Sequence, residues 1–157
     1  YIDLVIKLLN KKGIDITSNG IEVSLVDKKT LQESIFHLSN HNKETVKAIT
    51  ILNNNKYVIN ILWGLNQLEF ESVLAHELLH VYQIQNGYKL KSDVTEGFCN
   101  LGSQLVYDHD GSDLARLQLR TMYESNDPDY GKGFRNMSSR LDQLGWEGIL
   151  NNLPSFK

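Results

Sequence analysis

The sequence is poor in cysteine and proline, and it has no long apolar run. Its 157 residues include one cysteine, Cys99, and two prolines. A single cysteine excludes an intrachain disulfide and any metal site with two cysteine ligands from one chain. No apolar stretch approaches the roughly 18 residues of a membrane span. We therefore expect neither a disulfide framework nor insertion into a membrane.

The chain also lacks an excess of positive charge. It carries 16 Lys and Arg residues against 19 Asp and Glu residues, for a net charge of −3. Its adjacent basic pairs are Lys11-Lys12 and Lys28-Lys29. Nucleic-acid binding usually needs a clustered basic face, so this class of partner is disfavoured. We expect a monomer that does not bind nucleic acid.

No targeting segment is visible at the start of the chain. The sequence opens with Tyr1 rather than Met, which is typical of a fragment or a processed product. The absence of a leader therefore leaves the compartment of the full-length protein open. The single cysteine favours a reducing compartment such as the cytoplasm, with a secreted enzyme without disulfides as the alternative.

Composition and periodicity predict one α+β domain. Hydrophobic residues make up 41% of the chain and charged residues 22%, as in an ordinary globular protein. We expect a single domain over residues 1–157, with a small mixed or antiparallel sheet at about 1–65 and a helical part at about 66–157, because strands come first and helices later. The expected strands are 21–27, 45–52 and 57–63, with a hairpin turn at 53–56. The expected helices are 2–12, 29–37, 67 to the Asn86-Gly87 stop, 93–107, 112–124, 129–144 and a short one from 146.

Residues 76–80 read His-Glu-Leu-Leu-His, an HExxH motif inside a predicted helix. Residues i and i+4 project from one face of a helix, so His76 and His80 can reach one metal ion. Glu77 lies beside His76 on the cleft side, where its carboxylate can take a proton from metal-bound water. The pattern predicts a zinc site with two histidine ligands and Glu77 as general base. An apolar stripe would anchor the helix in the core: Leu74, Leu78 and Val81.

The two histidines need a third ligand, because catalytic zinc sites typically have three protein ligands and one open position. A metzincin would need Gly at position 83 and His at position 86, where this chain has Gln83 and Asn86. Glu96 is the favoured candidate, because an antiparallel second helix would bring its first turn to the metal. Glu96 could instead be a first-turn carboxylate that the helix dipole stabilises. The other candidates are Asp93, Asp108 and His109.

Several blocks of the sequence resemble the peptidase domain of the DA-one family. This family includes plant organ-size regulators with LIM and ubiquitin-interacting modules, and stand-alone relatives. The resemblance covers most of residues 21–152 and is strongest at 63–99, with the HExxH motif and the Val-Thr-Glu-Gly-Phe-Cys run, and at 124–135. It implies a zincin-like peptidase of the HExxH and Glu-Gly (gluzincin) type, with Glu96 as the third zinc ligand.

This chain departs from the plant members in two ways. It lacks their LIM and ubiquitin-interacting segments, and it lacks the long inserts near residues 108–112. The ubiquitin-dependent activation of the plant proteins is therefore not carried over, and the chain looks like a compact relative.

Two residues of the 124–135 block could donate to the oxyanion that forms on a scissile carbonyl. Tyr130 is a candidate catalytic residue, with an ordinary amphipathic side chain as the alternative. Arg135 is expected to form a salt bridge instead. Gly131 and Gly133 would permit a close backbone approach. For the remaining chemically active or large residues, we expect three surface histidines, a buried structural thiol and a core tryptophan: His37, His41, His109, Cys99 and Trp63.

Together these features predict a zinc metalloendopeptidase that hydrolyses peptide bonds of protein or peptide substrates. Zn²⁺ lowers the pKa of its bound water toward about 7, and Glu77 moves the proton to the leaving amine. The substrate would pair with an exposed strand edge, for which 45–52 is the candidate. The alternatives are a non-peptidase zinc hydrolase, a catalytically inactive zinc protein that binds a partner, and a structural protein without zinc. The intact Glu77 argues against an inactive protein, because a structural metal site needs no base.

Overall fold

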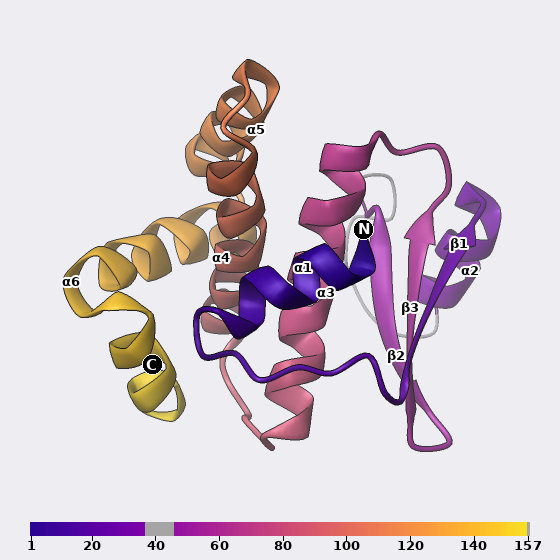
Figure 1. Ribbon diagram of the computed structural model, residues 1–157, viewed down its shortest axis with the longest axis horizontal. Helices are drawn as coiled ribbons and strands as arrows, with labels where there is room; N and C mark the ends of the chain where they lie inside the picture. Colours follow the sequence, from indigo (N-terminus) through magenta and orange to yellow (C-terminus); the bar gives the residue numbers. More distant parts are fainter. Residues whose placement is uncertain (37–45, 157) are drawn as a thin grey trace.

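The computed structural model describes residues 1–36 and 46–156, so His37 and His41 lie outside the described residues. The fold is α+β, with a three-stranded mixed sheet followed by a mostly helical half (Figure 1). The strands are β1 (Ile21–Val26), β2 (Ala48–Asn53) and β3 (Lys56–Leu62). The helices are α1 (Ile2–Asn10), α2 (Lys28–Phe36), α3 (Gln67–Gln85), α4 (Ser92–Asp110), α5 (Asp113–Glu124) and α6 (Phe134–Asn152), with short segments η1 (Pro128–Gly133) and η2 (Leu153–Ser155).

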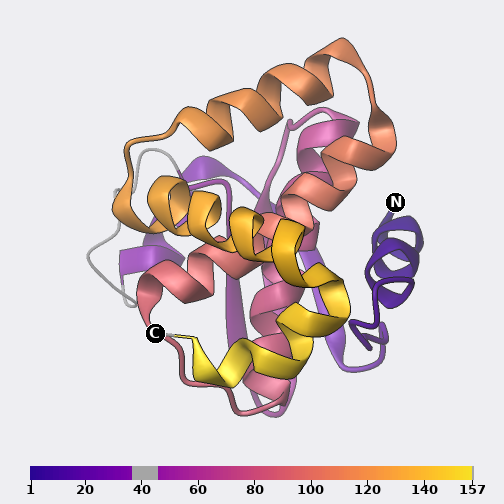
Figure 2. The ribbon, with the colours of Figure 1, turned by 90° about the vertical axis from the view of Figure 1, so that its left-hand side faces the viewer.

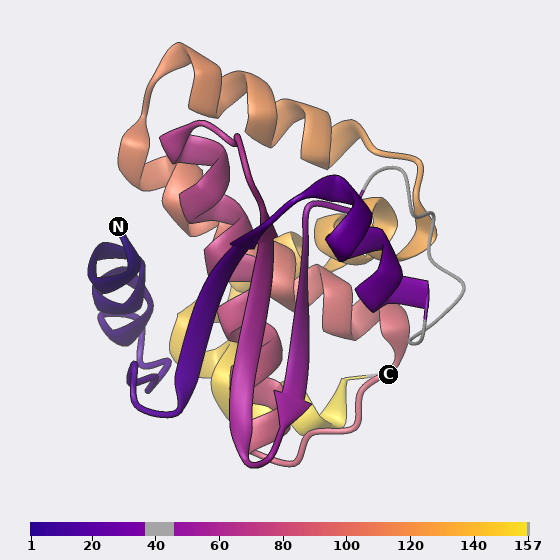
Figure 3. The same ribbon diagram turned by 90° about the vertical axis from the view of Figure 1, so that its right-hand side faces the viewer.

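The sheet has β3 at its centre, parallel to β1 and antiparallel to β2. The hairpin between β2 and β3 turns at Asn54 and Asn55, whose φ angles are 49° and 63°. Asparagine tolerates this left-handed conformation, which hairpin turns need. Ile59 and Ile61 of β3 are fully buried on the face that packs against α3. Within the described sheet β2 is an edge strand, as expected, on the side away from β1 and α1 (Figure 3).

Two antiparallel helices form the centre of the molecule. α3 packs on the sheet, and α4 packs on the other side of α3 (Figure 1). The predicted apolar stripe of α3 is fully buried, and α3 ends before Gly87, whose φ of 67° turns the chain back. The helices approach closely at Gly102, where a Cβ would press on the carbonyl of Ala75. This packing brings the first turns of α4 alongside the histidines of α3.

The outer layer consists of α5 and α6, of which α6 crosses over α4 (Figure 2). Sequence periodicity predicts a regular helix over 129–144, but residues 128–133 form the π-helical segment η1. The Asp127 carbonyl accepts from the N–H groups of both Gly131 and Lys132 over 2.9 Å, which widens the turn. Gly145, with a φ of 69°, kinks α6 and separates the predicted short helix that begins at Trp146.

Solvent exposure confirms two of the side-chain expectations and corrects a third. Cys99 is buried and His109 is exposed, as predicted. Trp63 was expected in the core, but its side chain is 72% exposed because β3 ends at Leu62. Among the described helices, none combines the length and the apolar character that a membrane crossing requires.

Candidate metal centre

The centre of the site is a carboxylate that lies between two imidazoles. Glu96 Oε2 on α4 is 3.0 Å from His76 Nε2 and 3.4 Å from His80 Nε2 on α3. Ligand atoms around a tetrahedral zinc ion with ordinary bond lengths are about 3.3 Å apart. The spacing of the three atoms therefore suits a small divalent cation. The antiparallel packing of α4 on α3 produces this spacing, as the sequence predicted.

Cys99 offers an alternative third ligand. Its Sγ and ring nitrogens of His76 and His80 all lie within 4.8 Å of one another, an arrangement that could hold a metal ion. Cys99 lies three residues after Glu96 on the same helix and is completely buried. Gln83 Nε2 donates a hydrogen bond of 3.1 Å to the sulfur. The structure thus provides two imidazoles and a choice between a carboxylate and a thiol.

The protonation of the two alternatives favours the carboxylate. Burial opposes ionisation of Glu96, but hydrogen bonds from His76 and His80 hold its pKa well below the ordinary value. Burial raises the pKa of the Cys99 thiol to about 11, so the thiol is protonated at neutral pH. Because a metal ligand must be deprotonated, Glu96 is ready to bind a cation and Cys99 must first lose a proton.

Glu77 lies next to His76 on α3, and its side chain is buried. Thr50 Oγ1 on β2 donates a hydrogen bond of 2.5 Å to Glu77 Oε2, which fixes the carboxylate. Sequence reasoning missed this role of Thr50. The feature that could have indicated this role is a hydroxyl within the apolar run 48–52, on the same strand face as buried Ala48.

Tyr130 and Asn100 complete the surroundings of His76. The rings of Tyr130 and His76 are stacked, with centroids 5.9 Å apart and an angle of 14° between their planes. Burial, followed by the negative charges of Glu96 and Glu77, raises the pKa of Tyr130. His76 Nδ1 is 2.8 Å from Asn100 Oδ1, and Asn100 Nδ2 donates to the Tyr130 carbonyl over 2.9 Å. Asn100 was also missed, although it follows Glu96 by four residues and so shares its helix face.

The other residues that the sequence offered as a third metal ligand do not show the contacts with His76 and His80 that Glu96 has. Asp93 Oδ1 accepts a hydrogen bond of 2.9 Å from the Val94 N–H. Asp108 and His109 are exposed near the far end of α4.

Arg135 has a structural role, as expected, but its hydrogen-bond partners among the described residues are backbone carbonyls and not a carboxylate. It donates to the carbonyl oxygens of Tyr123 and Ser125 over 2.8 Å and 2.7 Å. The guanidinium thus ties down the segment that leads into η1.

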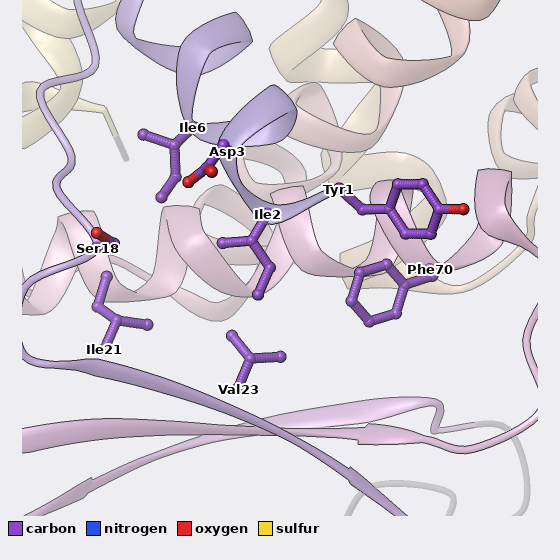
Figure 4. A pocket seen from close by; sticks show the side chains of 8 residues that line it. All are labelled: Tyr1, Ile2, Asp3, Ile6, Ser18, Ile21, Val23 and Phe70. Carbon is purple, nitrogen blue, oxygen red and sulfur yellow. The ribbon is translucent and has the colours of Figure 1, made fainter.

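A pocket of about 480 Å³ lies elsewhere, between α1, β1 and the start of α3 (Figure 4). Apolar side chains such as Ile2, Val23 and Phe70 point into it, and Asp3 is the one carboxylate in its lining. A hydrolytic centre usually combines several titratable groups. This pocket is therefore a weaker candidate than the cluster on α3 and α4.

A family model described as DA1-like (Protein DA1) matches residues 10–115, which is more than half of the chain. The chain belongs to the DA1-like family. This is the DA-one family that the sequence blocks resemble, and it is a family of peptidases. The matched residues include the HExxH motif, Glu96 and Asn100, whereas Tyr130 lies beyond them. Comparisons with curated proteins and with solved structures gave no match.

Metal binding should release a proton from His80. Burial would lower the pKa of His80, but contacts with Cys99 and Glu96 raise it well above the ordinary value. The metal-free imidazole therefore holds its proton more tightly than an ordinary histidine does, whereas a metal ligand must be neutral. We expect metal binding to release this proton, and metal affinity to fall as the pH is lowered. Calorimetric titrations in buffers of different ionisation enthalpy measure this release, and its absence would show a neutral His80.

Proposed function

We propose that this protein is a zinc-dependent endopeptidase whose metal ligands are His76, His80 and Glu96. The observation that carries the proposal is the position of the Glu96 carboxylate, which contacts both ring nitrogens across the packed helices. Two imidazoles and one carboxylate form a donor set typical of catalytic zinc and leave a further coordination position open. Membership of the DA1-like family supports peptide hydrolysis as the reaction.

The residues beside this donor set have separate roles in hydrolysis. Bound zinc would act as a Lewis acid toward the scissile carbonyl and would acidify water. Glu77 accepts the proton of the attacking water and delivers it to the leaving amine. Thr50 holds one of its carboxylate oxygens, and we assign the proton transfer to the other oxygen.

Tyr130 is the candidate donor to the oxyanion. Its raised pKa keeps the phenol protonated at neutral pH, so the hydroxyl can donate a hydrogen bond. We expect Tyr130→Phe to lower kcat by about 100-fold, the typical effect of losing one oxyanion donor, while zinc affinity is retained. Steady-state kinetics and a chelator competition measure the two quantities. A variant with the kcat of the wild type would assign Tyr130 a packing role only.

The edge strand β2 is the proposed docking site for an extended substrate. Thr50 of this strand contacts the general base, so a peptide paired with β2 would pass beside Glu77. Leu52 lies on the same face of β2 as Thr50 and is 53% exposed. A substrate side chain could contact Leu52 two residues along the strand.

Digestion of a mixed peptide library tests the proposed function. The zinc-loaded protein should generate new peptide termini that mass spectrometry detects. A strong chelator should stop the cleavage, and added zinc should restore it. A protein that holds one zinc ion per chain but cleaves no peptide would instead be a partner-binding zinc protein.

A further inference from the structure

Asn100 joins the candidate metal ligand His76 to the backbone of η1. Its side chain is buried on α4, with 6% of the residue exposed. The two ends of its amide have different partners, His76 Nδ1 at 2.8 Å and the Tyr130 carbonyl at 2.9 Å.

The hydrogen-bond partners determine which way the amide faces. A backbone carbonyl can only accept, so the NH₂ group of Asn100 must face Tyr130. The amide oxygen then faces His76 Nδ1, and this nitrogen must carry the proton. A neutral imidazole protonated at Nδ1 has its lone pair on Nε2. Without metal, Nε2 contacts Glu96 as a hydrogen-bond donor, and when a metal ion replaces that proton the electron pair of Nε2 is directed at the ion beside Glu96.

The second contact of Asn100 acts on η1. This segment lies close against α4. The approach is so close that a Cβ at Gly97 would overlap the carbonyl of Gly133. The amide of Asn100 then fixes the carbonyl of Tyr130 within the segment. The Tyr130 ring is stacked on His76, so the backbone anchor also sets where the phenol lies.

We propose that Asn100 is a positioning residue that sets the tautomer of His76 and, through its second hydrogen bond, the place of Tyr130. The inference rests on the proposed zinc site. An aspartate would accept from His76 equally well, but it has no donor for the Tyr130 carbonyl. It would also add a negative charge one helical turn from Glu96. Asparagine meets both requirements at once without adding charge.

Two substitutions separate the two contacts. Asn100→Leu removes both, whereas Asn100→Asp keeps the acceptor for His76 and removes the donor to Tyr130. The leucine variant should bind zinc about 10- to 100-fold more weakly, the usual effect of losing a partner that orients a metal-bound histidine. The aspartate variant should stay within about threefold of the wild type. Both variants should show faster amide hydrogen exchange in residues 128–133, measured on the zinc-loaded protein by mass spectrometry.

Ser103→Ala is the matched control. Ser103 is buried on the same helix and donates to the Ser72 carbonyl over 2.9 Å, so its loss removes a buried hydrogen bond that does not contact the histidines. It should leave zinc affinity and exchange in residues 128–133 unchanged. Asparagine and aspartate have almost the same shape, so the aspartate variant keeps the packing even where leucine disturbs it.

Three results would overturn the inference. They are a leucine variant that binds zinc like the wild type, an aspartate variant with unchanged hydrogen exchange in residues 128–133, and a Ser103→Ala control whose zinc affinity or exchange changes as in either Asn100 variant. These readouts do not require catalysis. A wild-type protein that binds zinc but cleaves nothing would end the peptidase proposal and leave this test intact.

Discussion

Replacing Glu77 by glutamine should lower peptide turnover by about 10²- to 10⁴-fold, the range that a general base contributes. Glutamine keeps the shape of the side chain and removes the basic oxygen. Zinc content should stay at that of the wild type, because Glu77 is not one of the proposed ligands. Steady-state kinetics together with elemental analysis separate the loss of chemistry from the loss of metal.

Glu71→Gln is the control for this substitution. Glu71 is also a buried glutamate of α3, and it accepts a hydrogen bond of 2.9 Å from Gln67. The control should keep the turnover of the wild type. Equal activity in the Glu77→Gln variant would remove Glu77 from the mechanism, and equal losses in both variants would indicate a general disturbance of the helix.

The third metal ligand should be Glu96 and not Cys99. Glu96→Ala should weaken zinc binding by more than the roughly 10- to 100-fold that the loss of an outer hydrogen-bond partner costs. Glu96→Asp should be intermediate, because the shorter side chain cannot reach the ion without movement of α4. Cys99→Ala should have little effect, because the Glu96 carboxylate contacts both ring nitrogens and supplies the third donor. Chelator competition measures all three affinities.

Asp93→Ala controls for the loss of a carboxylate one turn earlier on α4, and its zinc affinity should match that of the wild type. If Cys99→Ala loses zinc affinity and Glu96→Ala keeps it, the third ligand is the Cys99 sulfur and not the Glu96 carboxylate. The two helices and both histidines would then keep their roles with a different donor set.

The sequence predicted the parts of the site that follow from local periodicity. His76 and His80 share a helix face because they are four residues apart. The Asn86-Gly87 stop then reverses the chain, so the next helix returns alongside the first. The position of Glu96 near the histidines therefore follows from one turn and two helices.

The residues that were missed depend on contacts between distant elements. Thr50 reaches Glu77 only because β2 pairs with β3 and the sheet packs on α3. Asn100 gains its role from η1, whose π-helical turn is not visible in a simple helical period. The exposure of Trp63 likewise reflects where β3 ends in the assembled sheet, which hydrophobicity alone does not reveal.

Diffraction from zinc-loaded crystals at the zinc absorption edge tests the central claim most directly. We expect one anomalous peak per chain, at about 2.0–2.2 Å from His76 Nε2, His80 Nε2 and a carboxylate oxygen of Glu96. Glu77 should lie beside the metal without binding it. A peak more than about 4 Å from Glu96, or a peak bound to the Cys99 sulfur instead, would contradict the assignment.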